Sequence, residues 1–280
     1  MSDQAVIRVS RLSVTAIKGF GVQQVERLHI AEGGIAGDRS LFLVDDDDTL
    51  LSATRTAAFL PYWSRLTSPP GGEVLSIGLG DVVVLSSALE RGPALRTHFF
   101  GDRYVSGHLV GGPWAELLSG LAGRSVRLVR ATDPMAGYDV YPFTLVSEES
   151  VRALGHEADG SPMDGRRFRM TVTVEGVPAF AEDTWHGRSL TLGRCVVRSG
   201  GPVKRCAAVQ RDPGGSDVTT NALRSIKAVR GVGMSEFGRG LNLGVYGEVL
   251  VAGDVRVGDP VQVQPVPGVA KSPSEGGQSR

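Results

Sequence analysis

Glycine constrains this chain more than any other residue, because it supplies 38 of the 280 positions, roughly double its average share of ~7%. A glycine inside a helix costs roughly 1 kcal/mol relative to alanine, so this glycine content disfavours a mostly helical protein. The glycines follow no period of three, which excludes a collagen helix. The chain is therefore predicted to consist of short strands joined by tight turns.

The charged residues balance, since 30 lysines and arginines face 30 aspartates and glutamates. A general binder of nucleic acid would carry a net positive charge, so we expect no nucleic-acid partner, although a local anion site remains possible. No apolar run reaches the ~20 residues of a membrane span, and the first residues lack the pattern of a signal peptide. The two cysteines form no disulfide framework. A cytoplasmic protein without a membrane partner is expected.

Apolar alternation predicts several short strands, at residues 25–30, 40–44, 74–77, 82–85 and 126–129. Helical signals are fewer, and they indicate helices at residues 114–121, 147–154 and 220–229. Pro113 precedes the first of these, Ser147 caps the second, and Gly231 follows the third. The fold class predicted is a β-rich α+β protein with a few short helices.

Domain organisation follows from one polar, turn-rich segment at residues 131–142, which is predicted to link two domains. The N-terminal domain would span residues 1–130 and the C-terminal domain residues 143–265, which suits the usual size of about 150 residues per domain. Residues 266–280 are rich in glycine, serine and proline and are predicted to be a disordered tail. The acidic run at residues 45–48 is predicted to form a solvated turn.

Reactive chemistry concentrates in residues 200–215, GGPVKRCAAVQRDPGG. Lys204 and Arg205 precede Cys206, and neighbouring cations stabilise a thiolate, the form that attacks electrophiles or binds soft metals. Cys195 lies instead on an alternating strand and is predicted to be a buried core thiol. From the residues alone, Cys206 is either such a reactive thiol or a structural one.

Two arginines, Arg167 and Arg169, would point to the same face if their segment is extended. Such a pair can hold a phosphate through bidentate contacts, or it can face solvent on an edge strand. His108, His156 and His186 are possible proton donors, although surface or core positions are more typical of single histidines. No cluster of His and Cys suggests zinc.

Several motifs follow one another along the second half of the chain: RRFR (166–169), PAFAEDTW (178–185), PVKRCAAVQRDPGG (202–215), NALRSIKAVRG (221–231) and, after FG, YGEVLVAGDVRVGDPV (246–261). This ordered set resembles a MOSC domain, the family named for the C-terminal domain of molybdenum cofactor sulfurase. Earlier motifs are VTAIKG (14–19), GGIAGDRSLFLVD (33–45) and SATR (52–55). They resemble the β-barrel domain that precedes MOSC in the mitochondrial amidoxime-reducing component and its bacterial relatives.

The resemblance covers roughly residues 6–265 and implies a MOSC-type β-barrel with a smaller N-terminal β-rich domain. It also implies that Cys206 is the thiolate ligand of the molybdenum in a molybdopterin cofactor or, alternatively, a cysteine that carries sulfur. The other implied site residues are Lys18, Arg39 and Arg55 near the pterin phosphate, Arg167, Arg169 and Thr171 along the cofactor, and Asp212 as a loop-shaping residue.

Two positions depart from the family pattern. Lys18-Gly19 stands where the family has Lys-Ser, so one hydroxyl to the phosphate is missing. Arg169-Met170-Thr171 stands where Arg-Pro-Asn is usual, so a hydroxyl replaces a longer amide.

The function implied is that of an oxidoreductase, which removes oxygen from N-hydroxylated or similar N–O small molecules at molybdenum. Electrons would come from a separate protein, because two cysteines cannot hold an ordinary four-cysteine iron–sulfur cluster. The alternative is a molybdenum-independent sulfur carrier or C–S bond enzyme, with Cys206 as persulfide or nucleophile and an anionic substrate or pyridoxal phosphate at the cations. A third possibility is a cofactor carrier without catalysis. In each case we expect the site in the cleft between the two halves.

Overall fold

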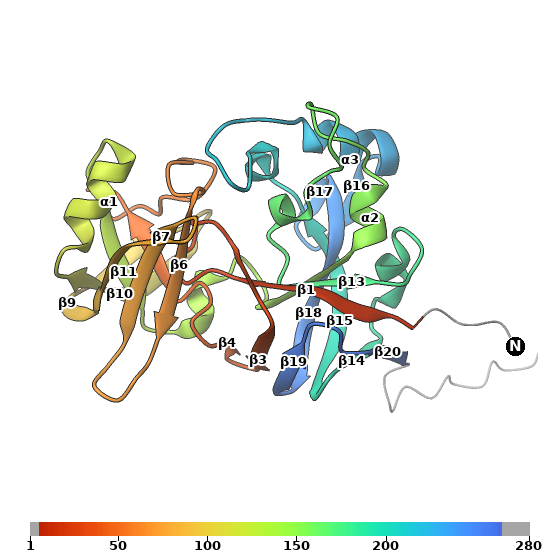
Figure 1. Cartoon of the computed structure of the whole chain (residues 1–280), viewed down its shortest axis with the longest axis horizontal. Coiled ribbons are helices and arrows are strands. Elements are labelled where there is room, and N and C mark those ends of the chain that lie inside the picture. Colours follow the sequence, from red (N-terminus) through yellow and green to blue (C-terminus); the bar gives the residue numbers. More distant parts are fainter. Residues whose placement is uncertain (1–5, 265–280) are drawn as a thin grey trace, which may run out of the picture.

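The computed structural model describes residues 6–264. Strands predominate, with few helices, and Figure 1 shows two strand-rich halves side by side. The strand-rich α+β class predicted from glycine and apolar alternation is confirmed. The predicted tail at residues 266–280 lies outside the described residues.

The largest sheet belongs to the half that carries most of the C-terminal sequence. Its eight strands are, in spatial order, β2 (Gln23–Val25), β1 (Arg8–Val14), β13 (Val172–Glu175), β12 (Phe143–Ser147), β18 (Asn242–Val251), β15 (Cys195–Lys204), β14 (Ser189–Leu192) and β20 (Val261–Gln264). Neighbours are antiparallel except β12 and β13, which are parallel. Side chains from both ends of the chain fill its core, among them Leu12, Val172, Leu190 and Val245.

The two ends of this sheet meet, because Arg8 pairs with Pro260 in an isolated bridge and the Val261 amide donates to the Ile7 carbonyl at 2.8 Å. The contact is a short bridge and no strand ladder completes a ring within the described residues. The β-barrel that the resemblance implies is therefore an open sheet whose edges touch. Gly258 and Asp259 lie in the turn that leads the chain toward this contact.

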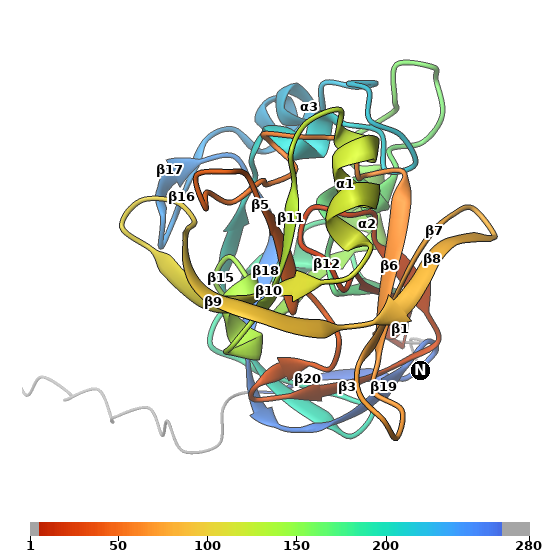
Figure 2. The same cartoon turned by 90° about the vertical axis from the view of Figure 1, so that its left-hand side faces the viewer.

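The other half is built from the middle of the N-terminal sequence. One sheet has the order β5 (Leu41–Val44), β11 (Arg127–Ala131), β10 (Tyr104–Gly111) and β9 (Glu90–His98), and a second has β6 (Tyr62–Thr67), β7 (Val74–Leu79) and β8 (Val82–Ala88). Helix α1 (Trp114–Ala122) covers them in Figure 2 and ends at Gly123 in a left-handed conformation. Buried Trp114 and Leu118 pack α1 into this core.

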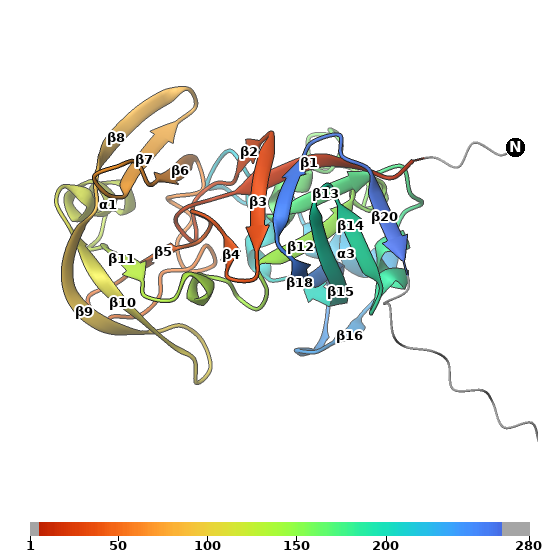
Figure 3. The same ribbon diagram turned by 90° about the horizontal axis from the view of Figure 1, so that it is seen from below.

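The first strands of the chain nevertheless lie with the C-terminal half. Strand β3 (Arg27–Ala31) pairs with β19 (Gly253–Arg256) and with β4 (Gly34–Ile35). Figure 3 shows β1 and β3 beside the C-terminal strands. The chain enters the other half between β1 and β2, where Ile17 and Phe20 lie in its core, and then returns to the C-terminal half for β2, β3 and β4. The domain boundary at residues 131–142 stays a prediction.

The remaining helices are short, and side chains cap their N-termini: Ser147, as predicted, and Asn221, which was not predicted. In α2 (Glu148–Arg152) the Ser150 amide donates to Ser147 Oγ at 3.0 Å. In α3 (Ala222–Arg230) the Arg224 amide donates to Asn221 Oδ1 at 3.0 Å. Single 3₁₀ turns are η1 (Pro134–Gly137), η2 (Gly165–Phe168), η3 (Ala181–Trp185) and η4 (Ala207–Gln210), and β16 (Gly233–Ser235) and β17 (Gly238–Gly240) form a small hairpin. Across residues 6–264, no helix has the length and apolar character needed to span a membrane.

The acidic run after β5 forms a turn, as predicted. Asp45 accepts a hydrogen bond from the Thr49 amide at 2.9 Å, and Arg127 pairs with Asp48 at 2.9 Å. These acids are therefore used to hold the turn and to neutralise an arginine of β11.

Candidate functional site

A cavity of about 570 Å³ is lined by segments of both halves of the molecule. The first half of the sequence contributes residues 18–19, Arg39, residues 52–54 and Phe100. The second contributes residues 138–142, Thr144, residues 167–171, residues 203–206, Ala208, Val209, Phe237 and Tyr246. The predicted position of the site between the halves agrees with this lining.

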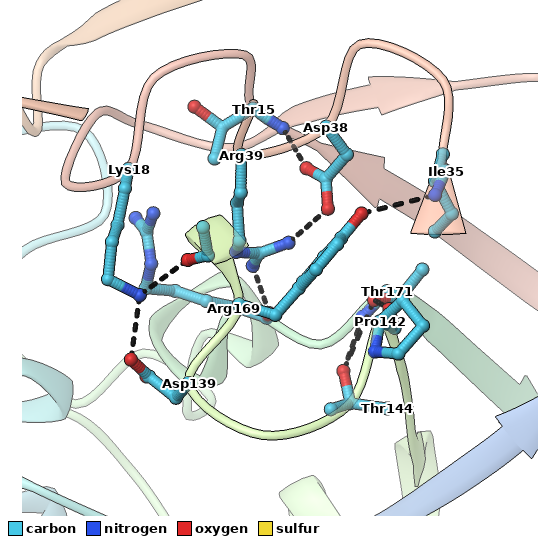
Figure 4. A network of polar contacts seen from close by, with 12 residues as sticks. Thr15, Lys18, Ile35, Asp38, Arg39, Asp139, Pro142, Thr144, Arg169 and Thr171 are labelled. Carbon is cyan, nitrogen blue, oxygen red and sulfur yellow. Dashed lines mark hydrogen bonds and ion pairs between the residues drawn. The ribbon is translucent and has the colours of Figure 1, made fainter. Parts of the chain in front are cut away.

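Lys18 lies at the cationic end of the cavity, just after β1. Its Nζ donates to Asp139 Oδ1 at 2.6 Å and to the Gly137 carbonyl at 2.9 Å (Figure 4). Burial lowers the pKa of this amine, and the nearby Asp139 carboxylate opposes that shift. Burial disfavours the charged form of Asp139 in turn, but the attraction of Lys18 outweighs it together with Arg39 and Arg103, so the pKa of Asp139 is lowered.

Arg39 is held beside Lys18 by a fixed backbone and a buried acid. Its φ of 47° lies in the left-handed region, and its carbonyl lies so close to Gly137 that a Cβ there would be 1.6 Å from the oxygen. The guanidinium donates to Asp38 Oδ2 at 2.5 Å and to the Arg169 carbonyl at 3.1 Å. Burial opposes the charge of Arg39, yet Asp38 and the other nearby groups together raise its pKa.

Arg169 and Arg205 are cations that contact no carboxylate in the described part of the chain. Arg169 donates to the Phe20 carbonyl at 2.6 Å, and burial, with Arg39 second, lowers its pKa to about 10. Arg205 donates to the Phe168 carbonyl and lies over the Phe168 ring at 5.4 Å. Its buried Nε has no protein partner in the described residues, and burial lowers its pKa.

Cys206 is exposed at the wall of the cavity, between the end of β15 and the turn η4. Both Arg169 and Arg205 lie close enough for a Cys206 thiolate to raise their pKa values against the opposing effect of burial. Cys195 is 0% exposed within the core of the main sheet, and burial raises its pKa to about 11. Cys195 is thus buried in the core, as predicted, while Cys206, which the residues alone left open, is exposed.

Six of the sequence-predicted site residues line the cavity: Lys18, Arg39, Arg167, Arg169, Thr171 and Cys206. Thr171 is 1% exposed, and its hydroxyl donates to the Pro142 carbonyl at 3.2 Å. It therefore holds the wall in place and offers no free hydroxyl to a ligand.

Arg167 and Arg55 do not contribute cations to the cavity. The Arg167 guanidinium is ion-paired with Glu157 and donates to Thr219 Oγ1 at 2.8 Å. Arg55 is exposed and does not line the cavity, whereas its neighbours Ser52 and Thr54 do. The Arg55 side chain turns back toward the Leu50 carbonyl at 3.4 Å.

The extended conformation expected for Arg167 and Arg169 is wrong. Residues 165–168 form the turn η2, because the Asp164 side chain accepts a hydrogen bond from the Arg166 amide at 2.8 Å and caps it. Arg169 then adopts a left-handed conformation with φ of 52°. The two guanidiniums consequently point to different partners instead of sharing one face.

The sequence reasoning missed most of the segment predicted as a linker. Tyr138, Asp139 and Tyr141 line the cavity, and the Tyr138 hydroxyl accepts a hydrogen bond from the Ile35 amide at 3.2 Å. Burial raises the pKa of Tyr138. The available signal was the density of aromatic residues in GYDVYP (137–142), which a flexible linker does not need.

Tyr246, Phe237 and Arg205 were also missed as lining residues. The Tyr246 ring packs against Tyr141 at 5.6 Å and Phe237 at 6.1 Å, and burial raises its pKa to about 12. These rings make the wall next to Cys206 aromatic. The histidines singled out as proton donors do not line the cavity, and Asp212 shapes its loop by accepting from the Gly214 amide at 2.8 Å.

Comparison with known proteins found a family model that matches part of the chain. Residues 132–262 match the family model described as the MOSC domain. Among solved structures, the crystal structure of the YuaD protein from Bacillus subtilis is similar with a TM-score of 0.44 and 12% sequence identity, over 93% of this chain and 96% of that chain. A comparison with curated proteins found no match.

Proposed function

Because the chain contains a MOSC domain over residues 132–262, we propose that its cavity binds a molybdopterin cofactor with molybdenum at Cys206. MOSC domains are generally associated with the molybdenum cofactor. The observation that carries the proposal is the convergence of Lys18, Arg39 and Arg169 with the accessible thiol of Cys206 on one cavity.

The residues present fit the chemistry of such a group, which combines an anionic phosphate with a soft metal centre. Cations stand at one end, where Lys18 and Arg39 lie side by side. The Cys206 sulfur is a soft ligand. Arg205 Nε is a buried donor without a protein partner in the described residues, which is a feature expected beside a missing acceptor.

When bound, the cofactor would supply a two-electron reduction that removes oxygen from an N-hydroxylated small molecule. Arg169 and Arg205 lie within electrostatic reach of the Cys206 sulfur and would face the anionic part of the group that it holds. The raised pKa of Tyr246, about 12, keeps its hydroxyl protonated near neutral pH. This hydroxyl can donate a hydrogen bond to a polar oxygen of the substrate, while Tyr141 and Phe237 offer aromatic surface beside it.

The second candidate is sulfur transfer or C–S bond chemistry without molybdenum. The exposed Cys206 thiol favours it, because a persulfide carrier or nucleophile needs access. An anionic substrate or pyridoxal phosphate would then occupy the cationic end. Lys18 suits the second of these by residue type, since a lysine amine can form a Schiff base.

Elemental and pterin analysis of the full-length protein from a molybdenum-replete host tests the proposal. We expect molybdenum and pterin in the unmodified protein and in the core variant Cys195→Ala, and loss of molybdenum in Cys206→Ala. Protein that contains neither would contradict the proposal. Metal-free protein whose sulfur-transfer activity disappears only in Cys206→Ala would establish the second candidate instead.

A further inference from the structure

The cationic end of the cavity contains two carboxylates that differ in how firmly they are held. Asp38 is fully buried, accepts from the Thr15 amide at 2.8 Å and pairs with Arg39. Asp139 pairs with Lys18, but its side chain is 65% exposed whereas that of Lys18 is 10% exposed. Figure 4 shows Asp38 joined to Thr15 and Arg39, and Asp139 at the end of the Lys18 side chain. Asp139 is therefore the carboxylate that a ligand can reach.

The backbone of Asp139 is fixed even though its side chain is accessible. Arg103 donates to the Tyr138 carbonyl at 2.7 Å, the Asp139 carbonyl at 3.1 Å and the Ala136 carbonyl at 2.6 Å. These three contacts hold the segment between η1 and β12 against the β9–β10 connection. Moving the Asp139 carboxylate away from Lys18 thus requires only side-chain rotation and leaves the wall intact.

Charge at this end is incompletely balanced. Lys18, Arg39, Arg103, Arg169 and Arg205 all lie within electrostatic range of Asp139, and Asp38 is the second acid near Arg39 and Arg169. Five cations near two carboxylates attract an anion. A ligand that displaces the Asp139 carboxylate from Lys18 must supply at least one negative charge in its place. The same ligand also faces the positive charges of Arg39 and Arg169. A doubly charged group meets this requirement better than a singly charged one.

We propose that Asp139 is the exchangeable counterion of the cavity and that a tetrahedral dianion, such as a phosphate monoester, binds by displacing its carboxylate from Lys18. Asp139 thereby lowers the affinity for anions in general and selects dianions over monoanions. The inference rests on the proposed function only in requiring that an anionic group binds at Lys18. It assigns a specificity-determining role to a residue in the segment that the sequence predicts as a linker.

Sulfate titration by calorimetry tests the inference, because sulfate stays a dianion over the working pH range. The full-length chain would be purified from a host that lacks molybdopterin, and nitrate would serve as the monoanion. We expect Asp139→Asn and Asp139→Ser to bind sulfate at least about tenfold more tightly than the unmodified protein. We also expect nitrate binding to become detectable in both variants. Asp81→Asn, an exposed carboxylate in the turn between β7 and β8, is the matched control and should change neither affinity.

Two other results separate the inference from the proposed function. If Lys18→Met abolishes sulfate binding while both Asp139 variants bind sulfate no more tightly than the unmodified protein, the anion site stands and the counterion role is wrong. If Lys18→Met and Arg169→Met leave sulfate affinity unchanged, anions do not bind at this end, and both the inference and the cationic part of the proposed function fail. Thermal unfolding of each variant checks that the fold is retained.

Discussion

Arg167 and Arg169 are two positions apart, yet they belong to regions with opposite electrostatics. Arg167 is enclosed with Glu157 in an ion pair whose side chains are 3% and 7% exposed. Arg169 faces the cavity and donates only to a carbonyl, and burial lowers its pKa to about 10. The first region uses its charges to hold the chain together, whereas the second leaves cations available to a ligand. Whether each arginine stabilises the fold or faces a ligand thus depends on its partner and not on the sequence motif that contains it.

The largest effect is expected from Arg167→Met, which would leave Glu157 buried without a cation. Breaking a buried pair by removing one partner costs about 3–5 kcal/mol, so the free energy of unfolding should fall by this order in urea denaturation. The double variant Arg167→Met/Glu157→Gln should recover part of the loss, since it removes the orphaned charge. Equal stability of the single variant and the unmodified protein would place Arg167 in the same class as Arg169.

Arg169→Met should behave in the opposite way. We expect sulfate affinity to fall by at least about tenfold, because a cation that faces the ligand is lost. The free energy of unfolding should stay unchanged or rise, because Arg169 is a buried cation without a carboxylate partner in the described residues. Calorimetry and urea denaturation of the same preparation measure both. A large loss of stability in Arg169→Met without a change in sulfate affinity would contradict this prediction and show that Arg169, like Arg167, mainly stabilises the fold.

Glu182 extends the comparison to a buried acid without a cation. Its side chain is fully buried, one carboxyl oxygen has no partner in the described residues, and burial raises its pKa. A raised folded-state pKa means that the stabilising contribution is complete below the unfolded value of about 4.3 and is lost as pH rises through the folded value. Unfolding measured across this range should show such a decline in the unmodified protein and a smaller one in Glu182→Gln. Identical pH profiles would contradict the assignment.

The smallest effect is expected from Arg55→Ala. This side chain is exposed and does not line the cavity, although the family resemblance implies a place near the phosphate. Sulfate affinity and the unfolding midpoint should therefore match those of the unmodified protein within error. A clear loss of affinity would show that the loop at residues 52–55 moves onto the ligand.

Local signals were enough for most of the secondary structure and for part of the site. Caps at Ser147 and Asn221 and the glycine after α1 are encoded within a few residues, so the helices could be predicted near their true positions. Cys195 could be assigned to the core because strand alternation buries it, whereas the residues alone left Cys206 open, and the structure exposes it just after β15.

Long-range partners could not be predicted in the same way. Glu157 captures Arg167 only because the Asp164 cap folds residues 165–168 into a turn. Asp139 reaches Lys18 across 121 positions of sequence, and β1 joins β13 across most of the chain. Strand periodicity carries no information about such pairings. For this reason residues 131–142 are predicted as a linker, although residues 138–142 line the cavity.

We propose that Cys206, at the wall of the cationic cavity, is a ligand of bound molybdenum. X-ray absorption at the molybdenum edge tests it most directly on the full-length protein from a molybdenum-replete host, with Cys206→Ser as the variant and Cys195→Ser as the control. The account predicts a sulfur shell around molybdenum that is one ligand smaller in Cys206→Ser and unchanged in Cys195→Ser. An identical sulfur shell in all three proteins, or no bound molybdenum in the unmodified protein, would contradict it.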